Sequence, residues 1–134
     1  MEIKYPVSAV DPVRVYAFPV AAGAVIQKGR IVCCNHNGFA VPAADAPGYV
    51  VVGVAKHSVD NSGGGNGDEW ITVYRKGLFE FDAVSITQAM VRTSMYVIDD
   101  HTIDDAAGPT YDVRVGSLMR FISATRGVVS IIDY

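Results

Sequence analysis

Hydrophobic residues recur at every second position in several parts of this chain. The alternation runs through residues 13–18, 70–75 and 78–82. A period of two is that of a β-strand, whose successive side chains point to opposite faces of the sheet. Residues 49–55 form a mostly β-branched run, typical of a strand buried on both faces. These short strands predict an all-β chain that folds as a small barrel or sandwich.

Turn signals separate the predicted strands. Residues 35–38, Asn-His-Asn-Gly, predict a hairpin because Asn and Gly tolerate positive φ. A second hairpin is expected to close the chain around residues 125–127. Gly77 interrupts a strand pattern, which predicts a bulge or a bend. Residues 60–68 contain four glycines and no apolar side chain, so we expect a mobile loop there.

One short helix is predicted among the strands. Ser85 or Thr87 is the expected cap, and the helix covers residues 88–91. Such a short helix must rely on packing, with Met90 and Val91 facing the core.

The N-terminal residues predict a separate extended arm. Pro6 and Pro12 interrupt regular pairing over residues 1–12, and residues 13–134 are expected to form a single β domain. The arm carries four sizeable apolar side chains, which a solvated tail has little reason to carry: Ile3, Tyr5, Val7 and Val10. Two interpretations stay open. The arm either orders against a partner subunit or the surface of a larger assembly, or packs on its own domain as an edge strand.

A further interface is expected on the strand at residues 70–75. Trp70 and Tyr74 share one face of this strand, opposite Ile71 and Val73. Ile71 and Val73 are the expected core side, which leaves the Trp70 face free for a subunit contact. The alternative is that both faces are buried.

Composition narrows the classes of partner. Of the 134 residues, 50% are hydrophobic and 19% are charged, which excludes intrinsic disorder. The net charge is −3 and no basic cluster occurs, so we expect no nucleic-acid partner. The apolar runs are far shorter than the roughly 20 residues that span a bilayer, and we expect no membrane partner. The N-terminal residues lack the apolar core of a signal peptide, which predicts synthesis in a cytoplasm.

The sequence shows no pattern of catalytic residues. We therefore predict no catalytic, cofactor-binding or metal-binding residues. Cys33 and Cys34 are neighbours, so a strand would place one thiol inside and one outside rather than joining them. His36 is nearby, but no second ligand pair completes a zinc site. The glycine-rich loop is followed by Asp68 and Glu69, which would repel phosphate.

The acidic stretch at residues 99–105 has several oxygen groups of the kind that bind hard cations such as calcium. It lacks EF-hand spacing and the central glycine of that motif. The interpretation as an ordinary hairpin tip is therefore favoured over a cation site.

Three stretches together resemble the capsid cement, or head decoration, proteins of tailed bacteriophages. They are the apolar-Gly-apolar-Lys-Gly pattern of residues 20–32, residues 39–45 with 51–55, and residues 71–81 followed by 87–89 and 96–102. The resemblance implies a β-tulip-like, non-enzymatic protein of the virion. It would bind the major capsid protein on the outer capsid surface and stabilise the head. It also implies a homo-oligomer, with a trimer favoured over a dimer.

Two other functions stay open at this point. One is a different virion β module, from a tail or baseplate. The other is a small ligand-binding or enzymatic barrel that uses the Cys33 and His36 region or residues 99–105.

Overall fold

The computed structural model describes residues 15–131, which form twelve strands. The first seven are β1 (Val15–Pro19), β2 (Val25–Ile26), β3 (Ile31–Cys34), β4 (Ala40–Pro42), β5 (Val50–Ala55), β6 (Val59–Asp60) and β7 (Trp70–Tyr74). The other five are β8 (Gly77–Ala83), β9 (Ser94–Val97), β10 (Thr102–Asp104), β11 (Arg114–Ser123) and β12 (Arg126–Ile131). The predicted all-β fold is confirmed. The predicted arm, with Ile3, Tyr5, Val7 and Val10, lies outside the described residues.

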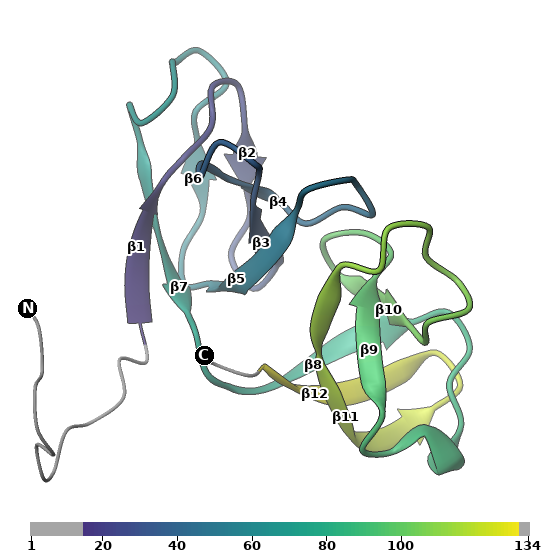
Figure 1. Ribbon diagram of the computed structural model, residues 1–134. Coiled ribbons are helices and arrows are strands. Elements are labelled where there is room, and N and C mark those ends of the chain that lie inside the picture. Colours follow the sequence, from purple (N-terminus) through teal and green to yellow (C-terminus); the bar gives the residue numbers. More distant parts are fainter. Residues whose placement is uncertain (1–14, 132–134) are drawn as a thin grey trace, which may run out of the picture.

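The strands build an open sheet and a closed barrel that lie beside each other (Figure 1). The sheet has the order β1-β7-β5-β3-β4, and the short β2-β6 pair lies at its end far from the barrel. The barrel runs β10-β8-β12-β11-β9 and closes because β9 pairs with both β11 and β10. Only the β8–β10 pair of the barrel is parallel. The sequence allowed a barrel or a sandwich, and the structure has a barrel next to a single sheet.

The predicted helix is a single 3-10 turn, η1 (Gln88–Met90). Its defining bond runs from the Val91 N–H to the Gln88 carbonyl, three residues apart, and the Thr87 side chain makes no cap hydrogen bond. Three residues are too few for the i to i−4 bonds of an α-helix. Met90 and Val91 do pack against the core, as the sequence predicted.

Two glycines shape the path between sheet and barrel. Gly77 opens β8 with φ of 142°, and at this bend the chain passes from the sheet into the barrel. Gly53 stands at a register shift between β3 and β5, where Val52 is the extra residue. A Cβ at Gly53 would lie 2.3 Å from the carbonyl oxygen of Tyr74, so only glycine fits there.

Sheet and barrel share one cluster of buried side chains. Ile31 and Val54 of the sheet belong to the same cluster as Val97 and Leu118 of the barrel. A second, smaller cluster lies wholly within the sheet unit and includes Ile71. The shared cluster gives the two units a common apolar boundary.

Polar contacts add to this boundary. The Asp45 carboxylate accepts hydrogen bonds from the backbone N–H groups of Thr110 (2.7 Å) and Tyr111 (2.8 Å). In addition, the Ile31 N–H donates to the Asp100 carbonyl at 2.7 Å, and Arg30 pairs with the Asp100 carboxylate at 3.0 Å. Two sets of polar contacts thus join the sheet to the barrel.

The glycine-rich loop differs from the prediction, because it is anchored to the chain that follows β1. Asn61 is only 2% exposed, and its side-chain amide donates to the carbonyls of Ala21 (2.9 Å) and Gly65 (3.0 Å). Gly67 N–H donates to the Val20 carbonyl at 2.9 Å. This loop has no apolar side chains, but polar side chains and backbone groups hold it through hydrogen bonds.

Candidate binding groove

An open groove of about 670 Å³ runs along the junction of sheet and barrel. Its walls come from β1, from β5 with the preceding turn, and from the barrel. The described residues that line it are Tyr16, Phe18, Cys34, Tyr49, Val50, Val51, Val52, Arg75, Asp112, Val113, Arg114, Val115 and Ile131. Most of these side chains are apolar, which suits the groove to an apolar ligand or peptide.

The sheet wall of the groove follows from strand alternation. Tyr16 and Phe18 are two residues apart on β1, so their rings point to the same side, with centroids 5.1 Å apart. Val50 and Val52 alternate in the same way on β5, and Val50 is 53% exposed. The bulge at Val52 matters because it lets Val54, beyond Gly53, turn toward the shared core.

Charged side chains lie among the apolar residues that line the groove. The Arg75 guanidinium lies 5.7 Å from the centroid of the Tyr16 ring, within the range of a cation–π contact. Arg114 is held by hydrogen bonds to the hydroxyls of Ser94 and Ser117. Asp112 adds one carboxylate. The groove therefore offers an apolar floor with fixed positive groups and one negative group.

The two cysteines lie as the sequence predicted, one buried and one partly exposed, and they form no disulfide. Burial raises the pKa of Cys33 to about 12. Burial also raises the pKa of Cys34, which lines the groove and lies 3.8 Å from the Gly38 carbonyl. Because the thiolate is the reactive form, both thiols are weak nucleophiles in the folded protein.

Trp70 and Tyr74 lie on the face of β7 opposite Ile71 and Val73, and neither is among the residues that line the groove. Ile71 and Val73 are fully buried, so the predicted core side of β7 is confirmed, and Trp70 is 56% exposed. The register pairs Tyr74 with Val15, which is also exposed. Lys56 lies over the Tyr74 ring at 5.9 Å. We call this surface the Trp70 face; it is formed by Val15, Ala17, Pro19, Trp70, Thr72 and Tyr74.

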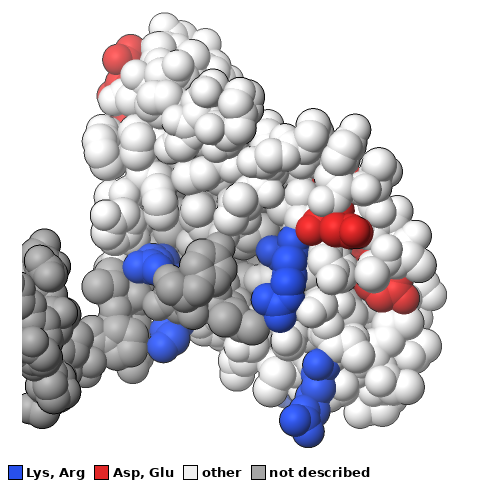
Figure 2. Space-filling view, in the orientation of Figure 1, with Lys and Arg blue, Asp and Glu red and all other residues white. Residues whose placement is uncertain are grey.

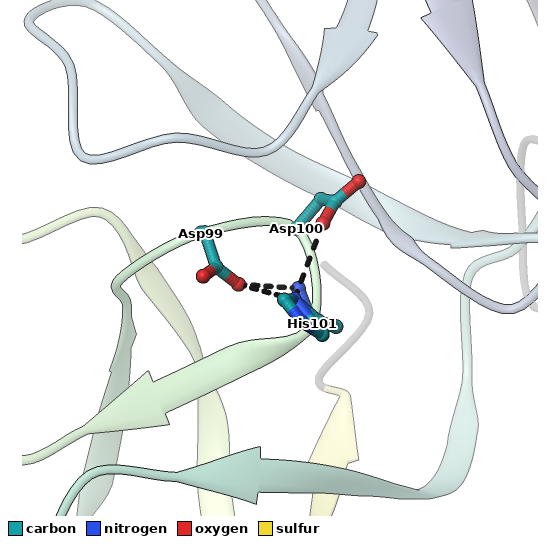
Figure 3. Close-up of side chains that lie close together, drawn as sticks. All are labelled: Asp99, Asp100 and His101. Carbon is teal, nitrogen blue, oxygen red and sulfur yellow. Dashed lines mark hydrogen bonds and ion pairs between the residues drawn. The ribbon is translucent and has the colours of Figure 1, made fainter.

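The acidic turn at the end of β9 gathers three groups of the kinds that bind metals (Figure 3). Asp99 Oδ1 lies 2.5 Å from His101 Nδ1, and Asp100 Oδ1 lies 3.4 Å from the same nitrogen. Asp99 Oδ1 also accepts the His101 backbone N–H at 2.9 Å, which is the hydrogen bond of an Asx turn. With Asp100 paired to Arg30, these contacts are those of a hydrogen-bonded turn that joins barrel to sheet.

Most of the surface in view is uncharged (Figure 2). Basic side chains are spaced over the middle and lower part of this face, while acidic ones lie at the upper left and on the right. Within residues 15–131, no helix is long and apolar enough to cross a membrane.

Comparison of the chain with models of protein families and with curated protein sequences finds no match. Its own geometry and residue pattern are therefore the basis for assigning a function.

The sequence pattern predicted an interface at Trp70 and Tyr74, but it did not predict the residues of the groove. Tyr16 and Phe18 appeared only as half of a strand alternation, and Val50 only as part of the run at residues 49–55 that was predicted to be buried. One signal was present: β1 has apolar residues on both faces although it is an edge strand. An edge strand of a solvated protein normally carries charges or polar residues.

Proposed function

We propose that this chain is a non-enzymatic structural protein of a bacteriophage virion that binds the outer surface of the capsid and stabilises the head. The observation that carries the proposal is the exposed apolar surface on both sides of β1. Val15, Tyr16 and Trp70 are all exposed, and the groove adds Val50. Contiguous apolar surface of this kind marks a site of protein–protein contact.

The resemblance to cement proteins supports the choice of partner, the major capsid protein. It covers residues 20–32, 39–45 with 51–55, and 71–81 followed by 87–89 and 96–102. The architecture suits this role. A β body whose two units share a core and polar links between loops is a firm support for a contact surface. The Trp70 face is the proposed capsid contact, because a large exposed aromatic side chain contributes strongly when it becomes buried at an interface.

The test is binding to emptied phage heads, measured by co-sedimentation and by the temperature at which the heads disrupt. Wild-type protein is expected to sediment with heads and to raise that temperature. Trp70→Ala is expected to weaken binding at least tenfold with little change in the melting temperature of the free protein. The control is Ile122→Ala, which removes an apolar side chain of 45% exposure from the far hairpin of the barrel.

Three results would contradict the proposal. The first is wild-type protein that fails to bind heads. The second is equal binding by the two variants. The third is binding to isolated tails or baseplates instead, which would assign the chain to another part of the virion.

A further inference from the structure

Strand β1 is the outer strand of the sheet, and the described residues leave its outer edge unpaired. Its first three residues, Val15, Tyr16 and Ala17, are all exposed. The groove borders one face of β1 and the Trp70 face borders the other. A strand with an open edge and exposed apolar side chains on both faces is suited to accept another strand.

Residues 1–14 supply a segment with the matching pattern. Ile3, Tyr5 and Val7 occupy alternate positions, with Glu2 before them and Lys4 between the first two. In an extended strand the three apolar side chains share one face, which an apolar groove can bury. Pro6 lacks an N–H group, but an edge strand tolerates proline where that position faces away from its partner.

The charges at the groove and the length of the N-terminal segment are both compatible with this pairing. The groove is lined by Arg114 and Asp112, and Glu2 and Lys4 offer charges of the opposite signs. Fourteen extended residues reach roughly 45 Å at about 3.3 Å per residue. That exceeds the radius of gyration of roughly 14 Å expected for a domain of this size, so the segment is long enough to reach a neighbouring molecule.

We propose that the groove of one copy receives residues 3–7 of a second copy, which pair with β1 as an added strand. In each copy, β1 is continuous with the N-terminal segment that enters a neighbour's groove. The same β1 borders the groove that receives the segment of another copy. Exchange of this kind repeats one contact from copy to copy, and it gives a ring where the rotation between neighbouring copies closes. The inference concerns copies in solution. It rests on the proposed function and specifies how the expected homo-oligomer forms.

Isotope-resolved photocrosslinking tests the pairing directly. A benzophenone amino acid replaces Tyr5, and chains with and without ¹⁵N are unfolded together, refolded, irradiated and digested. The expected products join residue 5 to peptides that contain Tyr16, Phe18 or Val50, with about half of them carrying unlike isotopes. Products with like isotopes alone would mean that the segment binds its own chain, and products elsewhere would mean another site; either result overturns the proposal.

Oligomeric state gives a second, independent measurement. Light scattering at micromolar concentration is expected to show an oligomer for the wild type and a monomer after deletion of residues 2–10. Val50→Glu is expected to act like the deletion, because it places a charge in the groove, whereas Ile122→Glu should leave the oligomer intact. Thermal melts of the variants establish that each monomer is folded.

A monomeric wild type, or an oligomer that survives both the deletion and Val50→Glu, would overturn the inference. Binding to heads is measured on the same variants. An intact oligomer that no longer binds heads after the deletion would overturn the groove pairing while leaving the proposed function standing. The reverse, an arm-dependent oligomer that never binds heads, would overturn the proposed function alone.

Discussion

His57 Nε2 accepts a hydrogen bond from the backbone N–H of Thr72 at 3.1 Å. Nδ1 lies 3.3 Å from the Ser58 carbonyl, so the proton of the neutral ring belongs on Nδ1. Lys56 N–H donates to the Thr72 carbonyl just beyond the last β5–β7 pair, Ala55 with Val73. The imidazole therefore takes the place of a backbone acceptor and extends the ladder by one bond after β5 has ended.

His57→Ala is expected to destabilise the fold by about 0.5–1.5 kcal/mol, the usual net value of one hydrogen bond. The end of β7 near Thr72 should also exchange its amide hydrogens faster. Urea unfolding and hydrogen exchange measure the two effects. His36→Ala is the matched control and should change neither; equal exchange at Thr72 in wild type and His57→Ala would show that the bond does not protect it.

Asn61→Ala is expected to destabilise the protein by about 1–3 kcal/mol, because the carbonyls of Ala21 and Gly65 lose the buried amide that donates to both. The loop at residues 62–68 should become a site of proteolysis. Limited digestion and thermal melting measure these effects. Ser62→Ala, in the same loop and exposed, is the control. A variant as stable and as resistant as the wild type would restore the prediction of a loop without structural contacts.

Because the Cys33 thiol is buried, the folded protein is expected to lose stability at alkaline pH. Its pKa rises from 9.0 to about 12 on burial, so above pH 9 the unfolded chain loses a proton that the folded chain keeps. Stability from this group is complete below pH 9 and falls as the pH rises toward 12, by at most about 1.4 kcal/mol per pH unit. Urea midpoints between pH 8 and 10.5 should show a shallower fall for Cys33→Ala than for Cys34→Ala or wild type. Identical slopes in all three would contradict the assignment.

Asp45→Ala is expected to loosen the barrel from the sheet near Thr110, because Thr110 and Tyr111 lose the carboxylate that their N–H groups share. We expect a loss of about 1–2 kcal/mol, below the full value for bonds to a charged group because the site is exposed. Hydrogen exchange at residues 109–112 measures the local effect. Asp105→Ala is the control, because within residues 15–131 its carboxylate bonds to the Ala107 N–H of its own turn. Unchanged exchange at residues 109–112 would show that other contacts hold this loop.

Much of the strand pattern could be predicted because alternation is a local property. The Asn-His-Asn-Gly turn, the closing hairpin and the buried side of β7 all follow from residues that are neighbours in sequence. Gly77 was expected at a bulge or bend, and it lies at a bend. The predicted helix became a 3-10 turn because three residues cannot hold an α-helix in the absence of a cap.

The groove could not be predicted, since its residues come from several separate parts of the chain. Tyr16 meets Val50 and Arg114 only after a sheet and a barrel have formed and come together. The anchored loop was missed for a related reason. Asn61 binds Ala21, forty residues earlier, and such a contact leaves no mark on local composition.

The order of amino acids was enough to establish that this protein is built of β-strands and which side of β7 faces the core, because side-chain alternation and turn chemistry act over a few residues. Two features needed the folded chain: the division of the strands into a sheet and a closed barrel, and the apolar groove that their junction leaves beside an open edge. Both depend on pairing between distant strands. Such pairing is set by the packing of the whole core rather than by any one segment.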